Sequence, residues 1–336
     1  MLTIKPIASL ENLKAFHNAI ALWYANYGRK HLPWRNFARD GSKAYEVYIS
    51  EIMLQQTQVA RVLDMYYFPF LERFKDLNSL AQASQEEVLL MWQGLGFYSR
   101  AHKLHSTAKI CAEVYSGYLP STYDTLLALP GIGTYTAGAV LCFGFGKLAW
   151  FADSNIKRLI SRIFGHTHLK ERDLGALTKA LLNREDSFTY NQALIDLGAL
   201  ICTPVPKCTF CPIKEFCVSK DTLPEPHKKA QNKREKRILH LLLLIQNETI
   251  ALIKSSDNLY KGLYNLPHIK PEQTTSLQCI GTFKHAYTKY NITAYVWCPK
   301  HYKQALHLIE SARFYALDML PPISNLTKKA LCHIRV

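Results

Sequence analysis

Four closely spaced cysteines are the most distinctive chemical feature of the sequence. Cys202, Cys208, Cys211 and Cys217 leave gaps of five, two and five residues. Four thiolates in so short a segment can surround one metal centre, either a zinc ion or a [4Fe–4S] cluster. Structural zinc usually uses two closely spaced cysteine pairs, and only Cys208 and Cys211 form one. The spacing therefore favours the iron–sulfur cluster.

Two carboxylates stand in surroundings that could shape their chemistry. Glu51 lies among Ile49, Ile52 and Leu54 in a stretch that is expected to be a buried helix. A structural ion pair would account for such a residue. Desolvation would instead raise its pKa and let it donate a proton near neutral pH. Asp153 is expected to stay ionised at the start of a later helix, where the helix dipole favours negative charge.

A glycine-containing turn precedes one of the predicted helices. Pro130, Gly131 and Gly133 are expected to form a hairpin too tight for side chains with a Cβ, and Thr134 or Thr136 to cap the helix that follows. Backbone N–H groups at such a helix start can bind an anion, and in a basic protein a nucleic-acid phosphate is the obvious one. An isolated turn of this kind could also be only a turn.

The composition limits the class of protein. The chain has 336 residues, 48% of them hydrophobic, and a formal net charge of +15 with a pI near 9.3. These values predict a globular protein with a polyanionic partner, which could be DNA, RNA or an acidic membrane surface. No signal peptide or membrane-spanning run is recognised. We therefore expect a cytoplasmic protein whose nine cysteines are not disulfides.

The elements that must position these residues change in type along the chain. Helical spacing of apolar residues predicts an all-α region, with helices at 13–23, 47–63, 87–92, 100–115, 135–145, 155–164 and 191–201. A basic stretch at 222–237 is typical of a linker, because six Lys or Arg and one Glu occupy 228–237.

The residues after this stretch favour strands. We predict a hairpin of 238–246 and 249–255 around Asn247-Glu248, further strands at 278–284 and 291–297, and helices at 304–312 and 323–331. The expected domains are 1–221, a helical region in two lobes, the linker 222–237, and 238–336, a smaller α+β domain.

Two segments carry a resemblance to a known family. Residues 191–201, which precede the cysteines, and Ser-Glu-Ile-Met-Leu-Gln-Gln-Thr-Gln-Val at 50–59 resemble the endonuclease III and MutY group of DNA glycosylases. The resemblance implies a helix-hairpin-helix fold and one [4Fe–4S] cluster per chain on the four cysteines. The first cysteine gap is one residue shorter than the family pattern.

The resemblance also implies roles for the carboxylates. Breaking an N-glycosidic bond requires a protonated leaving base and an anion beside the sugar cation. Glu51 would protonate adenine at N7, Asp153 would stabilise the sugar, and Asn155 would help to position these groups. Ser154 stands where the family has Gly. The family match adds these residues as substrate contacts: Trp34, Arg35, Leu54 and Gln192 in an adenine pocket, Gln56 as a wedge in the DNA, Phe97 for stacking, and Gly131 and Gly133 on the strand.

Tyr135 decides the type of glycosylase. The bifunctional endonuclease III type has a lysine at this position, which forms an imine and cuts the strand. Tyrosine cannot form the imine, so we expect a monofunctional enzyme. An endonuclease III-like glycosylase and lyase acting on oxidised pyrimidines, and a non-enzymatic iron–sulfur DNA-binding protein, are the alternatives.

The C-terminal region favours the MutY family, whose members continue into a Nudix-like domain. Residues 238–336 contain five acids, none paired at helical spacing to bind Mg²⁺, which favours recognition over nucleotide hydrolysis. Tyr287, Thr288 and Lys289 stand where MutY reads 8-oxoguanine with Phe-Ser-His. The resemblance thus implies a monomeric adenine glycosylase that acts on A:8-oxoguanine or A:G pairs in double-stranded DNA, with no membrane partner.

Overall fold

The computed structural model describes residues 10–167, 169–220, 234–256, 260–287, 290–300, 305, 307–309 and 311–332. The chain divides into two compact units. The first holds the described residues of 1–62, 76–78 and 107–228, and the second those of 63–75, 79–106 and 229–336. None of the helices in these ranges is both long and apolar enough to cross a membrane.

The first unit is helical, as predicted. Its helices are α1 (Leu10–Tyr27), α2 (Ala44–Met53), α3 (Val59–Val62), α8 (Tyr123–Leu127), α9 (Thr134–Ala139), α10 (Ser154–Ile163), α11 (Glu171–Ala180) and α12 (Ser187–Leu200), with short turns η2 (Pro33–Arg35), η4 (Val140–Gly144), η5 (Cys208–Phe210) and η6 (Lys214–Phe216). The helix α7 (Ser99–Val114) belongs to this unit from Thr107 onward.

The single helix predicted at 47–63 is wrong. The chain leaves the helix after Met53 and re-enters it at Val59, and Gln56 between them has a left-handed backbone with φ of 56°. The apolar spacing continues through the break, so periodicity alone did not reveal it. The consequence is a loop directly beside Glu51.

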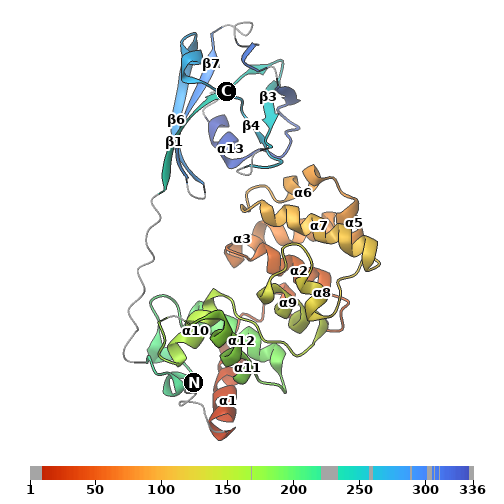
Figure 1. Cartoon of the computed structure of the whole chain (residues 1–336), viewed down its shortest axis with the longest axis vertical. Helices are drawn as coiled ribbons and strands as arrows, with labels where there is room; N and C mark the ends of the chain where they lie inside the picture. Colours follow the sequence, from red (N-terminus) through yellow and green to blue (C-terminus); the bar gives the residue numbers. More distant parts are fainter. Residues whose placement is uncertain are drawn as a thin grey trace. The chain divides into compact units, whose positions relative to one another are not determined.

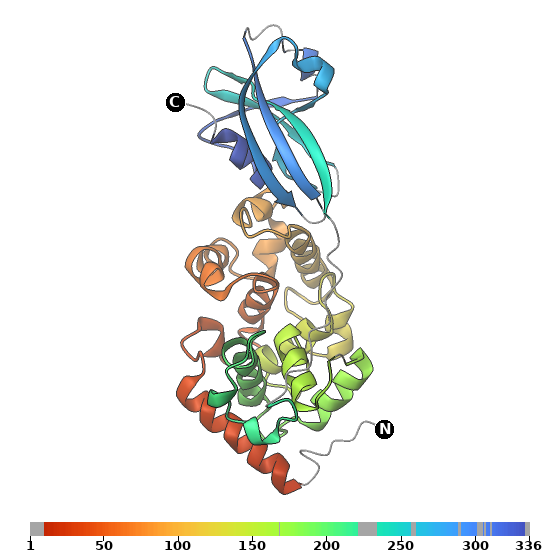
Figure 2. The ribbon, with the colours of Figure 1, turned by 90° about the vertical axis from the view of Figure 1, so that its left-hand side faces the viewer.

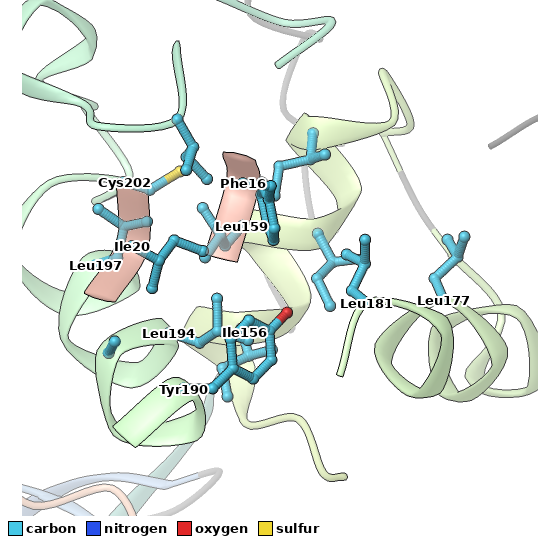
Figure 3. Close-up of a cluster of buried hydrophobic side chains, with 14 of the residues drawn as sticks. Phe16, Ile20, Ile156, Leu159, Leu177, Leu181, Tyr190, Leu194, Leu197 and Cys202 are labelled. Carbon is cyan, nitrogen blue, oxygen red and sulfur yellow. The ribbon is translucent and has the colours of Figure 1, made fainter. Parts of the chain in front are cut away.

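The core of the first unit fixes the start of α10 and the end of α12. Phe16 and Ile20 of α1 pack with Leu159 of α10 and Leu197 of α12, and Cys202 lies at the edge of the same cluster (Figure 3). These helices group together in the ribbon (Figure 1). Side chains at the start of α10 and at the end of α12 are therefore attached to closely packed helices.

The second unit joins short helices to two sheets. Its helical segments are η3 (Leu63–Tyr67), α4 (Phe68–Arg73), most of α5 (Leu77–Gln82), α6 (Gln85–Met91), the first part of α7, η7 (Pro271–Thr274) and α13 (Asn325–Leu331). A capping box starts α6: the Ser84 hydroxyl accepts from the Glu87 N–H at 3.2 Å, and the Ser84 N–H donates to the Glu87 carboxylate at 2.8 Å.

The strands confirm an α+β C-terminal region. They are β1 (Glu235–Leu242), β2 (Ile245–Gln246), β3 (Thr249–Lys254), β4 (Tyr264–Asn265), β5 (His268–Ile269), β6 (Leu277–Tyr287), β7 (Tyr290–Pro299) and β8 (Arg313–Ala316). One sheet has the order β5-β1-β7-β6, and the other joins β2-β3-β4 with β8 on β3. The long β6, β7 and β1 lie side by side in Figure 2.

The predicted hairpin is confirmed only at its turn. Asn247 and Glu248 have φ of 46° and 57°, and they join β2 to β3. The longer β1 instead pairs in parallel with β7. Strand β1 begins at Glu235, inside the range expected to be linker.

Other C-terminal predictions differ in outcome. The helix predicted at 323–331 is α13. The helix predicted at 304–312 falls partly outside the described residues, and the described residues 305, 307 and 308 are 3₁₀-helical. Strand β8 was not predicted. The family-based Nudix assignment and the domain boundaries stay predictions.

Candidate functional site

One pocket in the first unit gathers most of the predicted site. Its volume is about 890 Å³. The site residues that line it are Glu51, Asp153, Asn155, Tyr135, Trp34, Arg35, Leu54, Gln56, Gln192, Gly131 and Gly133. These residues come from segments far apart in the sequence, from η2 to α12, and the fold brings them together in one pocket.

Glu51 has the properties expected of a proton donor. It lies on α2 with 7% of its surface exposed. Burial raises the pKa of its carboxyl to about 7, the hydrogen bond from Tyr135 and the charge of Arg35 oppose that rise, and the charge of Asp153 adds to it. The group is therefore substantially protonated near neutral pH.

Asp153 is the N-cap of α10, as predicted. One carboxylate oxygen accepts from the Ile156 N–H at 2.7 Å, and the other accepts from the Asn155 amide at 2.8 Å. Both oxygens are thus held in place before any substrate binds. The helix dipole favours the negative charge at this position.

Tyr135 is held between the carboxylates and an aromatic wall. Its hydroxyl donates to Glu51, and its ring meets Phe151 edge to face at 5.3 Å. Phe151 in turn lies so close to Gly138 that a Cβ there would meet it at 2.8 Å. Gly138 therefore permits the contact that orients Tyr135.

The hairpin differs in detail from the prediction. Gly131 has φ of 80°, which favours glycine, but Gly133 has φ of −97° and open space where a Cβ would be. Gly133 is the N-cap of α9, and no side chain caps this helix. The predicted capping by Thr134 or Thr136 is wrong, because both lie within the helix.

The four cysteines line one small pocket beside α10. The lining includes all four, Cys202, Cys208, Cys211 and Cys217, and Arg162 is among the other residues that line it. The guanidinium of Arg162 donates to the Thr203 carbonyl at 2.6 Å and lies 3.4 Å from the Cys202 sulfur. Among the residues that the structure describes, no three metal-ligating groups stand at ligand spacing. Four thiols are a donor set that suits an iron–sulfur cluster.

A hydrogen-bond chain runs from the cysteine loop to Asp153. Arg158 donates to the Cys202 carbonyl at 2.7 Å, to the Gly198 carbonyl at 2.7 Å and to the Asn155 side chain at 2.9 Å. Asn155 then donates to Asp153. Helices α10 and α12 approach closely here, because a Cβ on Gly198 would lie 2.8 Å from the Cβ of Asn155.

The remaining predicted contacts belong to the second unit. Phe97 and Tyr287 line a cavity of about 1170 Å³, together with Tyr260, whose ring lies 4.6 Å from that of Tyr287. The buried Tyr260 hydroxyl has no hydrogen-bond partner among the described residues. Thr288 and Lys289 lie outside the described residues. Among the described residues, the cavity lining has three cationic side chains, Lys103, Arg237 and Lys261, and no acid.

Three residues with evident structural roles escaped the sequence prediction. Asp196 forms ion pairs with Arg35 and Arg29, Tyr24 contacts Gln192, and Arg158 joins α10 to the cysteine loop. A lone acid in the apolar stretch 191–201 was a signal for Asp196. Tyr24 and Arg158 carry no comparable signal, because their partners are distant in sequence.

Comparison with known proteins identifies the class. Residues 49–182 match the family described as HhH-GPD superfamily base excision DNA repair protein. A solved thymine-DNA glycosylase is 30% identical with a TM-score of 0.58, and covers 63% of this chain and 97% of its own. An endonuclease III trapped on DNA, 19% identical with a TM-score of 0.54, covers 66% and 98% and shares the fold. The helical region is thus that of a base excision repair protein.

The curated relatives are more specific. An adenine DNA glycosylase of Buchnera aphidicola (Schizaphis graminum) is 32% identical over 322 residues, 93% of this chain and 88% of that protein. The chain belongs to the adenine DNA glycosylase family. A second one, from Buchnera aphidicola (Baizongia pistaciae), is 40% identical over 208 residues, 61% of this chain and 58% of its own length. The human protein is 38% identical over 214 residues, 60% and 39% respectively.

Proposed function

We propose that the protein removes adenine from A:8-oxoguanine and A:G pairs in double-stranded DNA by hydrolysing the N-glycosidic bond. The observation that carries this proposal is the meeting of Glu51, with a pKa of about 7, and the N-cap carboxylate Asp153 in one pocket. Family membership and the net charge of +15 support DNA as the substrate.

The chemistry divides between the two carboxyl groups. Glu51 donates its proton to the adenine ring nitrogen N7, which turns the base into a neutral leaving group. Asp153, oriented by Asn155 and Ile156, stabilises the positive charge that develops on the sugar. Water then completes the hydrolysis, either directly or after a covalent sugar intermediate.

The same pocket supports a monofunctional reaction. Tyr135 donates a hydrogen bond to Glu51 and offers no amine with which to attack the sugar. We therefore expect an intact strand that carries an abasic site. An endonuclease III-like lyase would instead cut the strand.

Extrusion of the adenine from the duplex costs a few kcal/mol, which contacts in the pocket must offset. Trp34, Arg35, Leu54 and Gln192 line the pocket and supply ring packing and hydrogen bonds. The left-handed Gln56 stands in the exposed loop after α2, where it would wedge into the duplex. Gly131 and the open space at Gly133 would let a phosphate approach the backbone.

The cysteine loop would hold a [4Fe–4S] cluster through Cys202, Cys208, Cys211 and Cys217. The cluster would brace the loop against α10 and take no part in base release. Cys208→Ser should lower the iron content and the visible absorption of purified protein. Cys279→Ser, at an exposed cysteine outside this pocket, is the control and should change neither. Full iron content in the Cys208 variant would contradict the assignment.

The second unit would read the base opposite the adenine. Phe97 and Tyr287 line its cavity, whose cationic lining suits the DNA backbone. Thr288 and Lys289 are proposed to contact the 8-oxoguanine edge. Comparable release rates opposite 8-oxoguanine and guanine would argue against this role.

A duplex cleavage assay tests the proposed activity. The purified monomer is incubated with DNA containing adenine opposite 8-oxoguanine, and the strand is examined before and after alkali. Cleavage only after alkali supports a monofunctional glycosylase. Cleavage without alkali supports the lyase, and binding without base loss supports a non-enzymatic protein.

A further inference from the structure

A buried ion cluster lies behind the wall of the pocket in the first unit. The carboxylate of Asp196 on α12 is fully buried and accepts from both terminal nitrogens of Arg35, at 2.6 and 2.7 Å. Arg29 adds a side-chain bond at 2.8 Å and a backbone bond at 2.7 Å to the same carboxylate. Two arginines thus lock one acid in place.

The cluster continues to Gln192 through Tyr24. The Arg35 guanidinium donates to the Tyr24 hydroxyl at 3.4 Å, and that hydroxyl donates to the side-chain oxygen of Gln192. Tyr24 is 6% exposed, and neither it nor Asp196 lines the pocket. Arg35 and Gln192, by contrast, both line it together with Glu51. The two hidden residues therefore reach the pocket only through residues that face it.

The donor and acceptor properties of these groups fix the direction of each hydrogen bond from Asp196 to Gln192. An ionised carboxylate only accepts, and a guanidinium only donates. Tyr24 therefore accepts from Arg35 and has a single O–H, which it gives to the Gln192 oxygen. The amide N–H₂ is then the end of Gln192 left to face the pocket. Reversing the amide would place N–H₂ against the Tyr24 hydroxyl and expose the oxygen instead.

We infer that Tyr24, anchored through Arg35 by Asp196, is a positioning residue that fixes the amide orientation of Gln192, so that the pocket presents a hydrogen-bond donor to the extruded base. A base with a ring nitrogen acceptor at that edge, as adenine has, gains a bond there. A base with N–H at that edge would instead place its own donor against the amide donor of Gln192. The inference rests on the proposed adenine glycosylase activity and adds a determinant of its base selectivity.

A double-mutant cycle tests this chain of contacts. Tyr24→Phe, Gln192→Leu and the double variant are compared with the unaltered protein in single-turnover adenine release from an A:8-oxoguanine duplex. Losing one neutral hydrogen bond should slow release by about 3- to 10-fold in Tyr24→Phe. The same substitution in the Gln192→Leu background should change the rate by less than about 2-fold, because there is no amide left to orient.

A matched control separates positioning from packing. Tyr190 belongs to the same core cluster, is 3% exposed, and its hydroxyl has no partner among the described residues. Tyr190→Phe should leave the release rate unchanged. Tyr24→Phe should keep the duplex affinity close to that of the unaltered protein, because the ring is retained, and should lower the melting temperature only modestly for the two lost hydroxyl contacts.

The outcomes separate the positioning role of Tyr24 from the proposed adenine glycosylase activity. Coupled effects of Tyr24 and Gln192, with a silent Tyr190→Phe, support the positioning role. Additive effects overturn it and leave the adenine glycosylase proposal standing. Absence of adenine release by the unaltered protein overturns both.

Discussion

The pocket of the first unit and the cavity of the second differ in whether every buried polar group named for the site has a hydrogen-bond partner. In the pocket, Glu51, Asp153 and Gln192 each have a defined hydrogen-bond partner. In the cavity, the buried Tyr260 hydroxyl has no partner among the residues that the structure describes, and the lining includes aromatic and cationic side chains. A reacting site needs its protonation states and orientations set beforehand. A reading site can leave a group for the ligand to satisfy.

The largest expected effect is on the rate of adenine release, when the side chain of Glu51 can no longer donate a proton. Glu51→Gln keeps the shape of the side chain but cannot donate, so adenine release should fall about 10³-fold or more while duplex binding persists. Single-turnover kinetics and a binding assay measure the two effects. Glu46→Gln on the same helix is the control and should stay within about 2-fold. Substantial turnover by Glu51→Gln would move the proton donor elsewhere.

The rate of release should depend on pH through the same group. Because the pKa of Glu51 is raised to about 7, the protonated form is lost above that value, and the rate should fall about tenfold per pH unit there. Its ionisation also costs stability as pH rises from its usual pKa of 4.5 through about 7. Glu51→Gln should therefore lose less stability than the unaltered protein over that window. A rate that rises between pH 7 and 9 would refute the assignment.

The link between Asp153 and the cysteine loop should show a smaller effect. Arg158→Met removes bonds to Asn155, Gly198 and Cys202, so the unfolding free energy should fall by about 1–3 kcal/mol. Denaturant titration measures it. Lys157→Met is the neighbouring control, since its exposed pair with Glu171 is worth less than about 1 kcal/mol. Equal losses of unfolding free energy in the two variants would mean that the part-buried bonds of Arg158 add nothing to stability.

The smallest effect is expected in the second unit. Tyr260→Phe deletes a buried hydroxyl that has no partner among the described residues, so the unfolding free energy should stay equal or rise by about 1 kcal/mol. Thermal melting of the full chain checks this. A clear loss of stability would show that the hydroxyl is already satisfied, and the contrast between the two sites would weaken.

The sequence was informative where chemistry is local. Asp153 at a helix start and the burial of Glu51 follow from near neighbours, and both are found as expected. The break at Gln56 was missed because apolar spacing continues across it. The parallel pairing of β1 with β7 joins segments about fifty residues apart, which no local pattern specifies. Tyr24 and Asp196 were missed for the same reason, since their role arises from contacts between α1, η2 and α12.

The close approach of α10 and α12 at Gly198 leaves no room for a side chain between the two helices. A single methyl group at this position would collide with Asn155 and with the backbone around it. Displacement of Asn155 would be passed to Asp153 through the bond between them. The position of the Asp153 carboxylate therefore depends on Gly198, a residue that has no side chain of its own.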